Sequence, residues 1–234
     1  MYYEIAGLKV SMNPKHQPLI DQVIPYQVQY IPKIIDCAIP QGEAAISRYQ
    51  KKKPELSLGE AEYLLYGVYF YDALLEHQGI FLHASCIVYD GFAYLFSAPC
   101  GTGKSTHTSL WRKIFPTSFI LNDDKPAIRY QEGKLFAYGT PFSGKTNQNV
   151  NTKVPIAGIA FIKRGLENSI RKLLAKETLV LFLEQTLQPY HEQRLDQMTV
   201  LLEIIIANIP IYELTCNMED EAALTAYQAM KPKF

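Results

Sequence analysis

Residues 98–105 read Ala98-Pro-Cys-Gly-Thr-Gly-Lys-Ser105, and this stretch decides the fold. It fits a known spacing: a small residue, any four residues, then Gly-Lys and Ser or Thr. Consecutive backbone N–H groups in such a loop form a concave nest for phosphate oxygens. Gly101 and Gly103 allow the backbone to approach phosphates and to adopt a positive φ. The stretch therefore predicts a phosphate-binding loop.

The elements expected around this loop support the prediction. The apolar run FAYLFSA (92–98) predicts a strand before the loop, and a helix is expected after it, through about Phe115. The helix would add free N–H groups and its positive dipole end. Lys104 can then bridge the β- and γ-phosphates of a nucleotide, and the Ser105 hydroxyl can bind Mg²⁺. Ala98, where Gly is usual, is a mild departure. An ordinary Gly-rich turn is the alternative.

Two adjacent carboxylates, Asp123 and Asp124, follow the next predicted strand, SFIL (118–121). One aspartate can hold Mg²⁺, which needs few protein ligands because it keeps waters and phosphate oxygens. The other can take the proton from an attacking hydroxyl. Both can face one site only if the strand ends before them, because neighbouring side chains of a strand point to opposite faces. The alternative is a plain turn, since Asn-Asp-Asp-Lys-Pro is also a good turn sequence.

One histidine, His83, lies in the predicted strand GIFLHASCIVY (79–89), which Asp90-Gly91 joins to the strand before the loop as a hairpin. Histidine titrates near neutrality, so His83 can contact a γ-phosphate or orient a base. A lone histidine in an apolar strand is more often a core residue with satisfied hydrogen bonds, and the pattern alone favours that interpretation.

Composition and charge narrow the function classes. The 234 residues are 48% hydrophobic and 20% charged, and 23 basic residues balance 23 acidic ones. This composition is typical of a soluble globular chain, and the balanced charge gives no attraction to nucleic acid or to an acidic membrane. The longest apolar stretch, 199–214, contains Glu203, Asn208 and Pro210 and is too short and polar to cross a bilayer. Four dispersed cysteines and no signal peptide predict reduced thiols and a cytoplasmic protein.

The remaining pattern predicts an α/β (α+β) fold with a mixed central sheet and a small β-rich N-terminal region. Residues 1–55 form that region, with strands at 2–10 and 23–31 and a solvated connector, KKKP, at 51–54. Residues 56–234 form the domain with the loop. Its first helix follows Ser57 and Glu60, which have capping-box spacing, and ends at Gln78-Gly79. Further strands are expected at 126–130, 134–139, 157–162 and 211–215, and helices at 176–187, at 191–208 and from about 219.

Three landmarks resemble one family: the His-Ala pair beginning at His83, the loop that ends at Ser105, and the aspartate pair. In this order and spacing, over about residues 80–165, the chain resembles the catalytic domain of bacterial HPr kinase/phosphorylase. That enzyme shares its P-loop fold with ATP-dependent phosphoenolpyruvate carboxykinase. The resemblance implies ATP as the nucleotide, Mg²⁺ as the metal and a serine-type hydroxyl as acceptor. It also leaves open whether this chain forms a homo-oligomer, as members of that family do.

The resemblance implies a role for each matching residue. Ser105 and Asp123 would hold Mg²⁺, Asp124 would be the general base, and His83 would sit beside the transferred phosphoryl group. Lys104 would act in catalysis as well as in binding. The residues expected to bind the nucleotide are Cys100, Gly101, Thr102, Gly103, Lys104, Ser105 and Thr106.

The chain also departs from the family. A second signature of the Glu-Leu-Arg-Gly type is missing after the aspartate pair, and YGTPFSGKT (138–146) stands in its place. This puts the HPr substrate and phosphorolysis in doubt. The segment, with Lys145, either closes over the acceptor or the γ-phosphate or is a surface connection. Lys163 and Arg164, after the strand at 157–162, are either transition-state cations or solvated charges.

Three functions therefore compete. The first is an ATP- and Mg²⁺-dependent kinase whose acceptor is a Ser of a protein or peptide, or a small molecule. The second is a carboxykinase-like enzyme, which needs arginines for a carboxylate substrate and a second metal. The third is a nucleotide-binding regulatory module without turnover. The loop itself does not distinguish ATP from other triphosphates.

Overall fold

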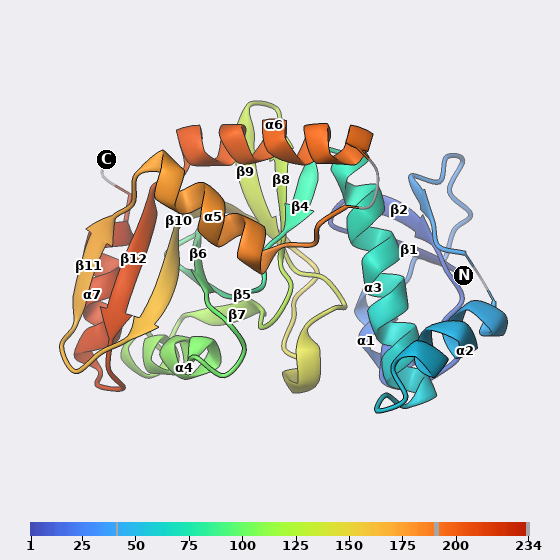
Figure 1. Ribbon diagram of the computed structural model, residues 1–234, viewed down its shortest axis with the longest axis horizontal. Helices are drawn as coiled ribbons and strands as arrows, with labels where there is room; N and C mark the ends of the chain where they lie inside the picture. The colour runs from blue at the N-terminus through green and yellow to red at the C-terminus, as the bar shows by residue number, and fades with distance from the viewer. Residues whose placement is uncertain (41, 190–191, 233–234) are drawn as a thin grey trace.

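A computed structural model describes residues 1–40, 42–189 and 192–232, which form two sheets and the helices packed on them (Figure 1). The small sheet has the order β1 (Tyr2–Ile5), β2 (Leu8–Ser11) and β3 (Cys37–Ala38). The large sheet has the order β4 (Gly79–Phe81), β8 (Ala127–Gln131), β9 (Lys134–Tyr138), β10 (Lys153–Arg164), β6 (Phe92–Ser97), β5 (Ala84–Tyr89) and β7 (Phe119–Asn122). Beside β10 it continues with β12 (Ile211–Cys216) and β11 (Ser169–Lys172).

The helices, in chain order, are α1 (Leu19–Gln22), α2 (Glu43–Lys52), α3 (Leu58–Glu76), α4 (Lys104–Ile114), α5 (Ala175–Gln185), α6 (Glu192–Asn208) and α7 (Glu221–Met230). Short 3₁₀ turns are η1 (Ile24–Tyr26) and η2 (Gly144–Thr146). Strand β10 pairs antiparallel with β9 through its first residues and then runs parallel to β6 and β12. The predicted α/β class with a mixed central sheet is therefore confirmed.

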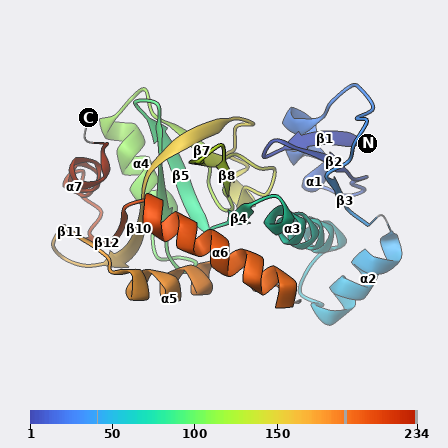
Figure 2. The same cartoon turned by 90° about the horizontal axis from the view of Figure 1, so that it is seen from above.

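Alternating side chains of the central strands separate two cores. On β6, Ala93 and Leu95 pack toward α5 and α6, whereas Tyr94 and Phe96 pack toward α4 and α7. This is the period of two expected of a strand that is buried on both faces. Figure 2 shows α4 and the α5–α6 pair on opposite sides of these strands. The loop between β6 and α4 therefore begins at a strand held from both faces.

The N-terminal strands pack against α3 in a third core. Tyr3, Ile5 and Val10 are buried together with Phe70 of α3 and Phe142, which follows β9. Burial of such side chains contributes about 1.5–3 kcal/mol each. Helix α3 thus joins the small sheet to the large one. The division of the chain after residue 55 stays a prediction.

Three predicted strands differ from the structure. Residues 2–10 form a hairpin rather than one strand, because Ala6 and Gly7 adopt positive φ and reverse the chain. Residues 23–31 begin as the 3₁₀ turn η1, where Pro25 lacks the N–H that a ladder needs. The strand predicted at 79–89 breaks at Leu82 and His83, and its two parts pair with different partners.

The predicted connector at 51–54 begins inside a helix. Lys51 and Lys52 are the last residues of α2, which buries Ile46. Lysines at a helix C-terminus interact favourably with its dipole, which explains the basic run.

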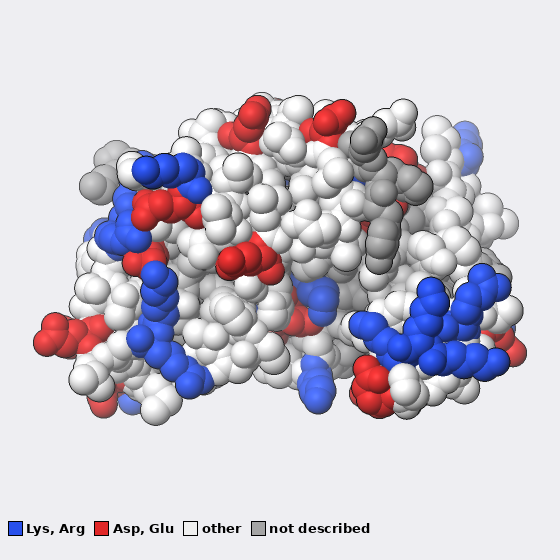
Figure 3. Space-filling view, in the orientation of Figure 1, with Lys and Arg blue, Asp and Glu red and all other residues white. Residues whose placement is uncertain are grey.

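Figure 3 shows basic side chains gathered over α2, and acidic and basic side chains meeting near the middle of the same face. The strand β11 was also not predicted.

Candidate functional site

The loop of residues 98–103 connects β6 to α4, as predicted. Gly101 and Gly103 have φ values of 77° and 118°, so both adopt backbone conformations that side chains disfavour. Gly103 is the N-cap residue of α4, so the loop leads directly into the first turn of that helix, whose N–H groups have no partner within the helix. The loop therefore offers the backbone donors expected of an anion site.

Lys104 folds back over this loop. Its Nζ donates a hydrogen bond to the Ala98 carbonyl at 2.8 Å, and the residue is buried. Burial lowers the pKa of Lys104 because it disfavours the charged ammonium, although Asp124 opposes the shift. An anionic ligand in the loop would favour the charged form of Lys104.

Arg164 contacts the loop from the end of β10. Its guanidinium donates to the Thr102 carbonyl at 3.1 Å and to the Gly101 carbonyl. Lys163, its neighbour, forms an ion pair with Glu213 of β12. Arg164 thus contacts the loop backbone. The sequence analysis had considered it only as a transition-state cation or as a solvated charge.

Asp123 lies at the helix side of the site. Its carboxylate accepts hydrogen bonds from Ser105 Oγ at 3.1 and 3.2 Å and from Ser85 Oγ at 2.6 Å. Ser85 belongs to β5 and also contacts Thr108 of α4 at 3.1 Å. The strand, the helix and the aspartate are thus joined by one polar cluster, in which Ser85, Thr108 and Asp123 are buried and Ser105 is exposed. Ser85 was missed in the sequence, although it directly follows the His-Ala pair.

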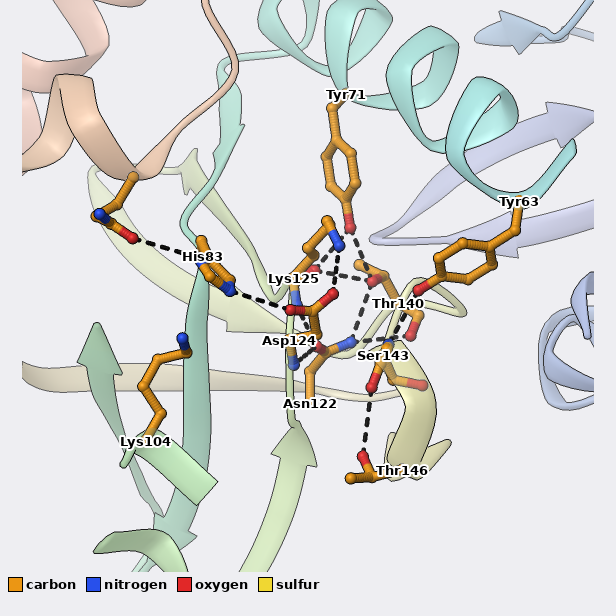
Figure 4. Close-up of polar contacts among 12 residues, drawn as sticks. Tyr63, Tyr71, His83, Lys104, Asn122, Asp124, Lys125, Thr140, Ser143 and Thr146 are labelled. Carbon is orange, nitrogen blue, oxygen red and sulfur yellow. Dashed lines mark hydrogen bonds and ion pairs between the residues drawn. The ribbon is translucent and has the colours of Figure 1, made fainter. Parts of the chain in front are cut away.

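Asp124 contacts two basic side chains (Figure 4). His83 Nε2 lies 3.3 Å from Asp124 Oδ1, and Lys125 Nζ contacts Asp124 Oδ2. His83 Nδ1 lies 3.2 Å from the side-chain oxygen of Gln185. Burial disfavours ionised Asp124, but the hydrogen bond with His83 and the charge of Lys125 outweigh it, so the pKa of Asp124 lies below its usual value. The carboxylate is therefore ionised at neutral pH.

A tight turn directs both carboxylates into the site. Strand β7 ends at Asn122, whose side-chain oxygen accepts hydrogen bonds from the N–H groups of Asp124 and Lys125 at 3.0 and 2.7 Å. The Asn122 amide group donates to the Thr140 carbonyl at 2.9 Å. Tyr71 of α3 donates to the Lys125 carbonyl at 2.6 Å. The predicted turn is therefore present and brings the two carboxylates to one cavity, whereas their roles in metal binding and proton transfer stay predictions.

The predicted residues line one cavity of about 450 Å³. From the sequence prediction it contains Cys100, Gly101, Gly103, Lys104, Ser105, Thr106, His83, Asp123 and Asp124. Thr102 lies instead in two cavities that flank the loop. Residues 143–146 also line this cavity, and Lys145 and Thr146 are exposed, so closure over the acceptor or the γ-phosphate stays a prediction beside the surface connection. The sequence analysis did not identify Lys125 and Gln185 as residues of the site. Lys125 could have been found from its position directly after the aspartate pair, whereas no sequence signal marks Gln185.

The donor set fits a metal carried in by a nucleotide. Ser105 and Asp123 offer a hydroxyl and a carboxylate oxygen in contact with each other. Mg²⁺ commonly binds one or two protein oxygens and completes its shell with phosphates and waters. Among the described residues, no group of three or more His, Cys, Asp or Glu side chains could hold a metal ion. Ser105 and Asp123 are therefore the residues at which such a shared metal could bind.

Within residues 1–40, 42–189 and 192–232, no helix is long and apolar enough to span a membrane.

The sequence matches neither a protein-family model nor a curated protein. Among solved structures, the chain is similar to the Hpr(Ser) kinase/phosphatase from Coxiella burnetii, with a TM-score of 0.35 and 11% sequence identity. The alignment covers 64% of this chain and 93% of that chain. A similarity at this level assigns neither a family nor an activity, so function has to be inferred from the residues of the site.

Proposed function

We propose that the protein is a phosphotransferase that moves the γ-phosphoryl group of ATP, with Mg²⁺, to a hydroxyl acceptor. One observation carries this proposal: a single cavity contains the glycine loop with Lys104 and the ionised Asp124 beside His83. A phosphate site and a base are the two parts that this chemistry requires. The choice of ATP over other triphosphates rests on the sequence resemblance alone.

The loop and Lys104 bind the phosphate chain in this proposal. N–H groups of the loop and of the first turn of α4 donate to phosphate oxygens, except that of Thr102, which donates to the Pro99 carbonyl, and Lys104 exchanges the Ala98 carbonyl for the β- and γ-phosphates. Ser105 and Asp123 would hold Mg²⁺, and the ion would supply positive charge to the phosphate oxygens. Arg164 keeps the loop in shape through its two carbonyls.

Asp124 receives the proton of the acceptor hydroxyl. The hydroxyl oxygen forms a bond to the γ-phosphorus, the bond from that phosphorus to the bridging oxygen breaks, and ADP leaves with the bonding pair. His83 and Lys125 orient the carboxylate before the reaction, since each contacts one of its oxygens. Most of the rate enhancement then comes from positioning and charge stabilisation.

The substitution Asp124→Asn tests the proposal. We expect phosphoryl transfer to fall by at least about 10²-fold, because the base is lost. Nucleotide affinity should stay within a few-fold, because the loop and Lys104 are unchanged. The assay is ADP release from ATP and Mg²⁺ with fractionated hydroxyl compounds and peptides, together with calorimetric titration of ATP. Asp90→Asn is the matched control, because this exposed aspartate lies in the β5–β6 hairpin.

The results separate the competing functions. Binding of ATP without acceptor-dependent ADP release in the wild type would favour a regulatory module. The occupied oxygens of Asp124 are the observation that favours this second candidate. No described residue lining the cavity is an arginine, so nothing there favours a carboxylate substrate of the carboxykinase type. No calorimetric heat with any purine triphosphate would contradict both nucleotide-based functions.

A further inference from the structure

Both carboxylate oxygens of Asp124 have a basic partner within the protein. Oδ1 lies 3.3 Å from His83 Nε2, and Oδ2 contacts Lys125 Nζ (Figure 4). A carboxylate that pairs with an ammonium is a weaker base than a free one, because the ammonium stabilises its ionised form. The Asp124 side chain is 22% exposed, so water can reach it. Opening one of the two contacts would therefore give a stronger base that is accessible to water.

The contact with His83 is fixed from several sides. The Gln185 carbonyl accepts a hydrogen bond from the His83 N–H at 2.8 Å, and the side-chain oxygen of Gln185 lies 3.2 Å from His83 Nδ1. On the other side, Ser97 Oγ donates to the His83 carbonyl at 2.9 Å. His83 cannot move away from Asp124 without breaking these hydrogen bonds.

The contact with Lys125 is fixed only at the backbone. The Lys125 N–H donates to Asn122 Oδ1 at 2.7 Å, and the Lys125 carbonyl accepts from the Tyr71 hydroxyl at 2.6 Å. The side chain is a flexible stem of four carbons. Its Nζ lies 6.0 Å from the centre of the Tyr63 ring, and Lys125 borders a cavity of about 680 Å³ that Asp124 also lines. The ammonium thus has a second partner and room to leave Asp124.

We infer that Lys125 is a specificity-determining residue: it pairs with Asp124 until an acceptor displaces its ammonium, and it thereby prevents water from serving as the acceptor. A water molecule has no further atoms whose contacts with the site could offset the loss of the ion pair, whereas a larger acceptor has them. This inference rests on the proposed function, because it concerns the reaction of ATP. The ion pair itself can be tested without nucleotide.

The reaction that Lys125 suppresses is the hydrolysis of ATP. In that reaction Asp124 takes a proton from water, and the water oxygen forms a bond to the γ-phosphorus. The bond from that phosphorus to the bridging oxygen breaks, and ADP leaves with the bonding pair. The products are ADP and orthophosphate. With Lys125 in place, the base is paired whenever no acceptor is bound, so this reaction stays slow.

Lys125→Met removes the ammonium and keeps an unbranched side chain. We expect ATP hydrolysis with Mg²⁺ and no added acceptor to rise roughly tenfold, because one charge-assisted contact of the base is lost. The assay is the release of ADP and orthophosphate. Lys113→Met is the matched control, because it removes an exposed ion pair with Asp220 and should leave the rate unchanged. Should Lys125→Met fail to fold, Lys125→Gln replaces it with the same expectation.

Two further variants show whether the gain passes through Asp124. The double variant Lys125→Met with Asp124→Asn should lose the gain, because the base is absent. Lys125→Arg keeps the cation, and a guanidinium can bind both oxygens of a carboxylate, so this variant should hydrolyse ATP no faster than the wild type.

Acetylation by acetic anhydride, followed by peptide mass spectrometry, measures the ion pair without nucleotide. Acetylation requires the uncharged amine, which an ion pair disfavours. We expect Lys125 to be acetylated several-fold faster in Asp124→Asn than in the wild type, whereas Lys113 should react equally in both proteins.

Two results would overturn the inference. One is an unchanged or reduced rate of ATP hydrolysis in Lys125→Met, and the other is equal acetylation of Lys125 in the wild type and in Asp124→Asn. Calorimetry with ATP and Mg²⁺ on the same proteins separates this inference from the proposed function. ATP binding together with an unchanged rate in Lys125→Met contradicts only the inference. Absence of ATP binding contradicts the proposed function, and faster acetylation in Asp124→Asn would then leave only the ion pair established.

Discussion

His107 is a buried histidine that does not belong to the site, although it lies one turn after Lys104. It is 2% exposed, and its Nε2 accepts a hydrogen bond from the indole N–H of Trp111 at 3.1 Å. Burial lowers the pKa of His107 to about 3, because the charged imidazolium is poorly solvated there. His107 is therefore neutral in the folded protein at physiological pH and anchors α4 in its core.

The stability of the protein should fall in mild acid because of His107. Below its ordinary pKa of 6.5, the unfolded chain takes up a proton that the folded protein refuses. The contribution of neutral His107 to the free energy of unfolding should thus be fully present above pH 6.5. As the pH falls from about 6 to 4, the free energy of unfolding should decrease by up to about 1.4 kcal/mol per pH unit. Urea unfolding at several pH values measures this slope. His107→Gln keeps an acceptor for Trp111 and should show a shallower slope; parallel slopes would exclude His107 as the cause.

Helix α3 begins with the capping box that the spacing of Ser57 and Glu60 predicts. Ser57 Oγ accepts a hydrogen bond from the N–H of Glu60, and the Glu60 carboxylate accepts one from the N–H of Ser57. This is the predicted capping box, and it is confirmed. The same helix supplies Tyr63 and Tyr71 to the site, where the Tyr63 hydroxyl accepts a hydrogen bond from Gly144 N–H at 2.9 Å. The first turns of α3 therefore contact the loop at Gly144, which borders the site.

Removing the cap should weaken the helix measurably. Ser57→Ala should lower the free energy of unfolding by about 1 kcal/mol, because the backbone N–H of Glu60 in the first turn of α3 loses its acceptor. Equilibrium urea unfolding followed by circular dichroism measures the change. Ser57→Asp restores a cap acceptor and should stay near the wild type; a loss as large as that of Ser57→Ala would contradict the capping explanation.

Elements with a local signal were predictable, and contacts between distant segments were not. The capping box, the Asp90-Gly91 hairpin and the strand–loop–helix around Lys104 follow from residues a few positions apart. The contact of His83 with Asp124 depends on the break between β4 and β5, which apolar periodicity does not show. Partners such as Gln185 come from elements about 100 residues away, and nothing in their own neighbourhood marks them.

At the scale of the whole molecule, α6 connects the two halves. It runs along the top of the large sheet to α3 (Figure 1). Arg194 near its start contacts Asp72 at 3.1 Å and Glu76 at 2.7 Å, both on α3. The Arg194 side chain and Asp72 are largely buried, whereas Glu76 is more than half exposed, so salt screens the pair with Asp72 less than the pair with Glu76. Arg194 thus connects α6, which covers the large sheet, to α3, which packs against the small sheet.

Loss of this link should destabilise the whole chain. Arg194→Leu leaves two carboxylates of α3 without their cation, and we expect the free energy of unfolding to fall by about 1–2 kcal/mol. Thermal or urea unfolding measures the effect, and raised salt should reduce the difference. Arg112→Leu is the control, because Arg112 is exposed on α4 and has no ion pair in the described part of the chain. An equal loss in both variants would argue against a specific role of Arg194.

The contacts between the N-terminal residues and the loop at 143–149 matter for the design of shortened variants. Gln22 donates to the Gly144 carbonyl and Tyr26 donates to Asn149 at 2.7 Å, so two residues among the first 26 of the chain contact a segment that borders Asp124. A shortened variant that starts at α3 would keep the glycine loop and both aspartates yet lose these braces. A minimal fragment should therefore retain the opening residues, because their removal would take away the contacts that hold one wall of the cavity at Asp124.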